Sequence, residues 1–194
     1  MTNIRHRRSS LPRASFAITA GVAIALAGFH LAIAKQLTNT EMKQLPTTLW
    51  QTIDLLVEQI RFRRTNVEGV LDVTLFDSDP RQFVIQPSFQ SLEGGPVRLA
   101  DGVVMESIDL RVRPERASHP GFLGLRVAGT CIRLDVVRAR YGTLSITDYP
   151  RGRSWDEVTS HTTIQPWGRL SFSFAERNPD CLSSVVLRPK DLSR

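Results

Sequence analysis

The sequence lacks the short motifs that accompany the common catalytic chemistries. It contains no G-x-S-x-G nucleophile elbow, no H-E-x-x-H zinc motif, no C-x-x-C pair, and no P-loop or G-x-G-x-x-G loop for phosphates. Histidine is scarce outside the N-terminal segment, since two of the four histidines, His6 and His30, lie within that segment. We therefore expect no catalytic residue, no bound metal and no cofactor.

Two histidines remain as candidates for acid–base chemistry. His119 lies in a stretch rich in breaker residues, and His161 lies on an expected strand. A proton shuttle at neutral pH needs a pKa near 7, which histidine provides. The acids nearest to His161 along the chain are Asp148, Asp156 and Glu157. The favoured interpretation is that both histidines are exposed or simply hydrogen-bonded. The alternative is a hydrolase that uses His119 or His161 in catalysis. Adjacent Asp156 and Glu157 side chains do not face each other, so we expect a solvated turn there.

Lysine is almost absent, so the positive charge is carried by arginine. The chain has a formal net charge of +6, with Lys only at positions 35, 43 and 190. Four of the arginines lie in the first 34 residues, which contain no acid, so the remainder is nearly balanced. Nucleic-acid binding requires a concentrated basic surface. We therefore expect no nucleic-acid partner.

One stretch, residues 14–34, lacks charge altogether and follows a basic segment with Arg5, Arg7, Arg8 and Arg13. This order, with Ala32-Ile33-Ala34 at its end, is typical of a cleaved signal peptide. The stretch has 21 residues, enough to cross about 30 Å of hydrocarbon, so a retained anchor is the alternative. In either case residues from Lys35 onward are exported. We expect a periplasmic or secreted protein, or else a single-pass inner-membrane protein whose only membrane contact is residues 14–34.

The chain has only two cysteines, Cys131 and Cys181, and both lie in the exported part. In an oxidising compartment such a pair is most simply a disulfide. Closing a loop of about 50 residues would stabilise the fold by roughly 4 kcal/mol on the chain-entropy model. A reactive thiol or a metal site is the less favoured alternative, because no cluster of histidines accompanies the cysteines.

The periodicity predicts the α+β class, with an antiparallel sheet, one long helix and one short helix. Residues 35–47 form a spacer, and residues 48–194 form the exported domain, with an internal boundary at 114–121. The long helix is expected at 48–64, where apolar residues recur every three or four positions and Thr48 with Gln51 fits a capping box. The short helix is expected at about 133–141, before Gly142. Strands are expected at 70–76, 83–89, 108–112, 122–127, 144–149, 158–165, 170–174 and 182–187.

The two halves of the domain share an order of elements. Ile85-Gln86-Pro87 in the first half corresponds to Ile164-Gln165-Pro166 in the second, which suggests two tandem helix-plus-sheet units. This layout, with the helix sequence Leu-Asp-Val-Val-Arg-Ala-Arg-Tyr-Gly before a strand, resembles the units of bacterial β-lactamase inhibitor protein and of the small outer-membrane assembly lipoproteins. The resemblance implies protein binding. The chain departs from the lipoproteins because it lacks their lipidation cysteine.

The loop at residues 150–157 is the segment most typical of a binding site. Arg151 and Arg153 offer forked donors for carboxylate or phosphate, and Trp155 offers a large contact area. The alternative is that Trp155 packs back onto its own core.

We therefore predict a non-enzymatic exported envelope protein that binds another macromolecule, as an inhibitor, an immunity-type protein or an assembly protein. The expected partner is a protein of the cell envelope. Two alternatives stay open: a secreted hydrolase that acts on envelope material, and a bitopic inner-membrane subunit of a secretion or assembly machine.

Overall fold

The computed structural model describes residues 42–78, 90–113 and 121–191. The signal or anchor segment, His119 and the strand expected at 83–89 lie outside these ranges. Most of the expected boundary at 114–121 lies outside them as well, so that boundary stays a prediction. Within the described ranges, no helix is both long and apolar enough to span a membrane.

The helix expected at 48–64 is two helices, α2 (Leu49–Glu58) and α3 (Arg64–Leu71). The predicted capping box begins α2: Gln51 Oε1 accepts from the Thr48 backbone N–H at 2.9 Å, and the Gln51 N–H donates to Thr48 Oγ1. The helix ends at Glu58 with its C-cap at Gln59, and the left-handed backbone of Arg61 (φ 74°) separates it from α3. The third helix, α4 (Leu134–Tyr141), lies where the short helix was predicted.

The strand expected at 70–76 is wrong for most of its length. Its first two residues, Val70 and Leu71, belong to helix α3, which buries Val67 and Leu71 against the core, and residues 72–75 are neither helix nor strand. Only β2 (Phe76–Asp77) is extended. The described residues therefore contain three helices of similar, modest length, not one long and one short helix.

The strands of the described ranges form one sheet of ten, in the order β1-β4-β5-β6-β10-β9-β8-β7, with β3 also pairing with β5 and β2 with β3. All neighbours are antiparallel except β1 and β4, so the sheet is mixed. Its helix and strand content fits the predicted α+β class. The remaining strands are β1 (Lys43–Gln44), β3 (Gln90–Gly94), β4 (Val97–Arg98), β5 (Val103–Val112), β6 (Phe122–Gly129), β7 (Ser145–Asp148), β8 (Val158–Gln165), β9 (Gly168–Ala175) and β10 (Leu182–Pro189).

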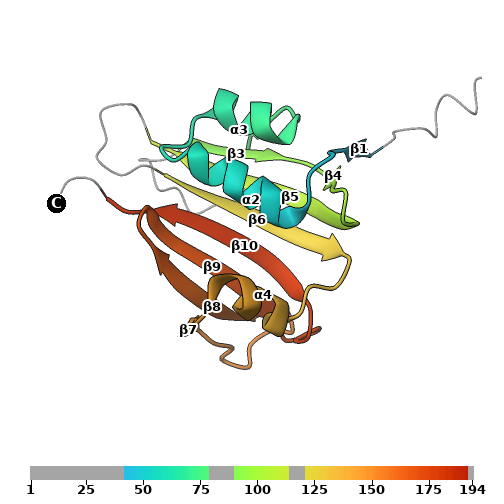
Figure 1. Cartoon of the computed structure of the whole chain (residues 1–194), viewed down its shortest axis with the longest axis vertical. Coiled ribbons are helices and arrows are strands. Elements are labelled where there is room, and N and C mark those ends of the chain that lie inside the picture. The colour runs from blue at the N-terminus through green and yellow to red at the C-terminus, as the bar shows by residue number, and fades with distance from the viewer. Residues whose placement is uncertain (1–41, 79–89, 114–120, 192–194) are drawn as a thin grey trace, which may run out of the picture. The chain divides into compact units, whose positions relative to one another are not determined.

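The order of elements repeats along the chain. Helices α2 and α3 precede the successively paired strands β2, β3, β5 and β6, and helix α4 precedes the successively paired strands β7, β8, β9 and β10. The last strands of the two series, β6 and β10, pair with each other. Figure 1 shows them side by side, with α2 and α3 over one part of the sheet and α4 over the other.

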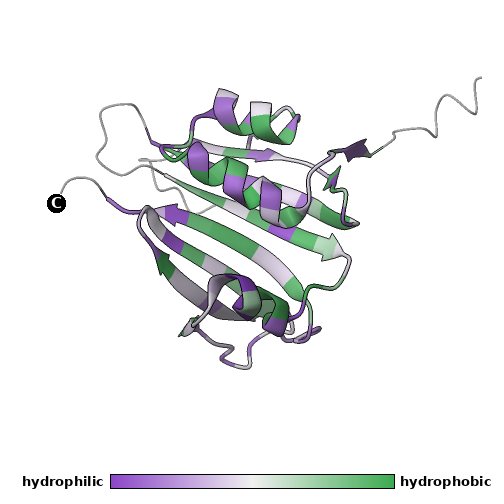
Figure 2. Ribbon diagram, in the orientation of Figure 1, coloured by the Kyte–Doolittle hydropathy of each residue, from purple (hydrophilic) through white to green (hydrophobic). Residues whose placement is uncertain are grey.

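One face of the sheet carries the core, because the three helices bury their apolar sides against it. Trp50 of α2 lies edge-on to Tyr141 of α4 and to Phe172 of β9, so both helices meet the same face. Along β9, Leu170, Phe172 and Phe174 point to this face and alternate with serines that point away. Figure 2 shows the same alternation as green and paler bands along the long strands. None of the described helices covers the opposite face, which we call the open face.

Candidate functional site

Hydroxyl groups line the open face where the two strand series meet. The register places five side chains in one row across the strands: Ser107, Arg126, Ser184, Ser173 and Ser160. Ser160 and Ser173 share a hydrogen bond of 2.9 Å between their hydroxyl oxygens. In the next row Thr162 bonds Ser171 at 2.8 Å, and Thr147 bonds Thr162 at 2.7 Å. The hydroxyls on β7, β8 and β9 are thus held by one another, and Ser173 and Thr162 among them are buried.

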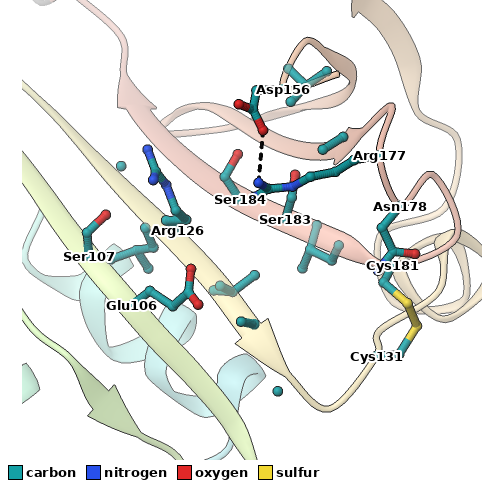
Figure 3. A pocket seen from close by; sticks show the side chains of 18 of the residues that line it. Glu106, Ser107, Arg126, Cys131, Asp156, Arg177, Asn178, Cys181, Ser183 and Ser184 are labelled. Atoms are coloured by element: carbon teal, nitrogen blue, oxygen red, sulfur yellow. Dashed lines mark ion pairs between the residues drawn. A yellow bond between two sulfur atoms is a disulfide. The ribbon is translucent and has the colours of Figure 1, made fainter. Parts of the chain in front are cut away.

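A hollow of about 550 Å³ lies on this face, over β5, β6 and β10. Figure 3 shows the side chains of Glu106, Arg126 and Ser184 pointing into it, on the side of the sheet away from the helices. At one end Asp156 forms an ion pair of 2.9 Å with Arg177. Charged and hydroxyl side chains therefore share the lining of the hollow with apolar residues such as Val158 and Val186.

The predicted disulfide is present at the rim of the hollow. Cys131 and Cys181 are bonded, with their Cα atoms 5.0 Å apart and a sequence separation of 50. Next to the bond, the Leu182 backbone N–H donates to the Ile132 carbonyl at 2.9 Å. The segment that follows β6 is therefore fastened to the turn that precedes β10.

The loop at residues 150–157, between β7 and β8, is organised by Glu157. Its Oε2 accepts hydrogen bonds from the backbone N–H groups of Arg151 at 2.7 Å and Arg153 at 3.2 Å. These bonds, that of Arg151 foremost, lower the pKa of the Glu157 carboxyl. Asp156 pairs with Arg177. Asp156 lies exposed in a turn, as expected from the sequence, and both acids also fasten the loop through these contacts.

The side chains predicted to bind are exposed at the edge of this loop. Trp155 is 77% exposed, so it does not pack back onto the core. Tyr149, at the start of the loop, is 70% exposed. The Trp155 carbonyl accepts from the Arg177 backbone N–H at 3.0 Å, which holds the loop backbone against the β9–β10 turn. Arg151 and Arg153 are exposed as well, and their assignment as binding residues stays a prediction.

His161 lies on the other side of the sheet, on the helix-covered face. It is buried, with its ring edge-on to Phe174 at 5.7 Å between centroids. Burial, and secondarily the positive charge of Arg138, lower its pKa. Its Nδ1 has no hydrogen-bond partner in the described part of the chain, so none of the three acids near it in sequence orients the ring. Across the ranges that the structure covers, no group of three or more His, Cys, Asp or Glu side chains is placed to hold a metal ion.

A third row on the open face was missed in the sequence. Arg111 lies opposite Phe122, and Arg188 lies opposite Arg169. The guanidinium carbons of Arg111 and Arg188 lie 5.1 and 5.4 Å from the centre of the Phe122 ring. We call Arg111, Arg188 and Arg169 the arginine row. The alternation along β9 indicated which face Arg169 occupies, but only the strand register brings the three arginines together.

No protein-family model, no curated protein and no solved structure matches the chain. Its function is therefore inferred from the geometry of the open face and of the loop at residues 150–157.

Proposed function

We propose that this is a non-enzymatic protein of the cell envelope, exported to the periplasm, which binds another protein through the open face and the loop at residues 150–157. The observation that carries the proposal is the open face itself, a long antiparallel surface lined by hydroxyl and charged side chains. Inhibitor, immunity-type and assembly proteins are the classes that work by binding alone.

Two features support an exported location. The disulfide between Cys131 and Cys181 is of the kind that persists in oxidising compartments such as the periplasm. The uncharged stretch at residues 14–34, behind its arginines, has the composition of an export signal.

The surface has the parts that protein interfaces use. Trp155 and Tyr149 present large aromatic areas with few rotatable bonds, and such side chains often dominate binding energy. The hydroxyls of Ser160 and Ser171 on β8 and β9 are already held by hydrogen bonds to neighbouring hydroxyls, so a partner would not have to order them. Asp156 lines the hollow and belongs to the loop, so the two surfaces adjoin.

The same proposal includes a tandem origin for the two strand series. Each series follows at least one helix, runs through four successively paired strands and ends at the β6–β10 pair. This order supports two related helix-plus-sheet units, whose open faces together form one binding surface. On this topology the second unit begins after β6, near Cys131.

Site-specific photo-crosslinking in cells tests the proposal. A photoreactive residue at Glu106 or Arg126, both exposed on the open face, should give an adduct with one envelope protein, identified by mass spectrometry. The same residue at Glu58 or Val136, exposed on the helices, is the matched control and should give none. Adducts formed only from the helix positions would contradict the proposal.

The identified partner then allows a direct measurement with purified components. The triple variant Arg151→Ala/Arg153→Ala/Trp155→Ala should weaken binding by about 30-fold or more, because truncation of a Trp or Arg hot spot costs about 2 kcal/mol or more. Thermal stability should be unchanged, since these side chains are exposed. An unchanged dissociation constant would remove the loop from the interface.

A further inference from the structure

The arginine row places two like charges, Arg188 and Arg169, directly next to each other. Arg188 and Arg169 are directly paired across β10 and β9, and like charges in such cross-strand positions destabilise a sheet. Arg111 is paired with Asp109 at 3.2 Å. In the described part of the chain, neither Arg188 nor Arg169 forms an ion pair or a hydrogen bond through its guanidinium. Two cations are thus left for a ligand to neutralise.

Two arginines of the row, Arg111 and Arg188, are also held in place. Phe122 lies between the strands that carry Arg111 and Arg188, and both guanidiniums stack within cation–π distance of its ring. Side chains held in this way lose less conformational entropy on binding than free arginines do. Ile164, paired with Arg169 across β8 and β9, is 75% exposed and adds an apolar contact at the end of the row.

The chemistry of the row favours carboxylates. A guanidinium presents two parallel N–H donors that match the two oxygens of a carboxylate, and such pairs are among the stronger charge-assisted hydrogen bonds. Neighbouring strands lie about 4.8 Å apart, so adjacent arginines of the row can reach carboxylates placed about 5–7 Å apart. Acidic residues two apart on a strand, or four apart on a helix, have this spacing.

The surroundings of the row favour a polypeptide over a broad anionic surface. The next row of the open face contains Glu93 and Asp109, opposite each other on β3 and β5. A membrane or a nucleic acid would bring phosphates against these acids as well as against the arginines. A short acidic segment can follow the cationic line alone, which is the complementary arrangement.

We propose that the arginine row binds an acidic segment of the partner protein, with Arg188 and Arg169 each engaging an Asp or Glu carboxylate. This inference rests on the proposed function and specifies the chemistry of the partner. It assigns Arg188 and Arg169 as the residues that select the partner, while the loop at residues 150–157, at the other end of β8, anchors it.

The test uses a defined probe, a fluorescein-labelled peptide of ten glutamates, with a peptide of ten glutamines as its neutral counterpart. In fluorescence anisotropy at pH 7.5 and low ionic strength, the protein should bind the glutamate peptide and not the glutamine peptide. Arg169→Gln/Arg188→Gln should weaken binding at least tenfold. The control variant Arg61→Gln/Arg138→Gln removes the same charge away from the row and should stay within twofold of the unmodified protein.

Three results would overturn the inference. The first is an equal loss in both double variants, which would mean that only the net charge matters. The second is an absence of binding to the glutamate peptide. The third is binding of phosphatidylglycerol vesicles through Arg169 and Arg188 with no binding of the peptide, which would assign the row to a lipid surface.

The two proposals fail in different ways. Crosslinks from Glu106 and Arg126 that persist in Arg169→Gln/Arg188→Gln with unchanged partner affinity would reject the arginine row and leave the proposed function standing. Crosslinks formed only from the helices, with the peptide still bound at the row, would reject the proposed function instead.

Discussion

Removal of the Cys131–Cys181 disulfide should lower the free energy of unfolding by about 4 kcal/mol. The bond closes a loop with a sequence separation of 50, and the chain-entropy relation for a loop of that length gives this value at 25 °C. Domains of this kind have a total stability of only about 5–15 kcal/mol, so the bond supplies a large part of it. At about 2–4 °C per kcal/mol, the melting temperature should fall by roughly 8–16 °C.

Replacing the two cysteines changes little in the structure besides the crosslink. Cys131 is exposed and Cys181 is half-buried, so replacing both by alanine removes little packing. The effect therefore reports the crosslink rather than a cavity. The assay is urea denaturation of the unmodified protein, with and without reductant, and of Cys131→Ala/Cys181→Ala. The reduced protein and the double variant should be destabilised alike, and reductant should not affect the double variant. A loss below about 1 kcal/mol would refute the entropic reasoning.

Three further predictions concern His161, Glu157 and the N-terminus. Burial lowers the pKa of His161 below its usual 6.5, so the stability tied to its neutral form is complete above pH 6.5 and is lost as pH falls through the folded pKa. The free energy of unfolding, measured in urea, should therefore fall more between pH 7.5 and pH 5 in the unmodified protein than in His161→Leu. An equal fall in both proteins would contradict this. In Glu157→Gln the amides of Arg151 and Arg153 should exchange hydrogen about tenfold faster, because a neutral amide oxygen accepts more weakly than the carboxylate; unchanged exchange would mean that other contacts hold the loop. Intact-mass measurement of the exported protein should give a chain that starts at Lys35, and a retained N-terminus would favour the membrane-anchored alternative.

The parts of the fold that depend on neighbouring residues could be predicted from the sequence. Helix α4 ends at Gly142, whose φ of 73° and N–H bond to the Arg138 carbonyl at 2.8 Å are those of a helix cap. The β8–β9 hairpin follows from two alternating runs around Pro166-Trp167-Gly168. In both places the local preference and the tertiary structure agree, so the pattern alone was sufficient.

Helix α3 was missed because local preference and tertiary contacts disagree there. The segment around Val70 is rich in β-branched and apolar residues, which favours a strand. The burial of Val67 and Leu71 against the core outweighs that preference, and this burial depends on strands far along the chain. The arginine row was missed for a related reason. Alternation assigns Arg169 and Arg188 to a face of their strands, but their adjacency follows only from the register of β9 with β10.

The β6–β10 pair has a consequence for dissecting the protein. These strands pair over the positions from Ser184 with Arg126 to Leu187 with Leu123, so each strand series supplies the other with backbone hydrogen-bond partners. A truncated chain that kept only one series would leave β6 or β10 as a bare edge. An unpaired edge of this length, with Leu123, Leu125 and Val185 no longer covered by a neighbouring strand, promotes strand addition and aggregation. We therefore expect either series alone to aggregate, so functional work needs a chain that contains both.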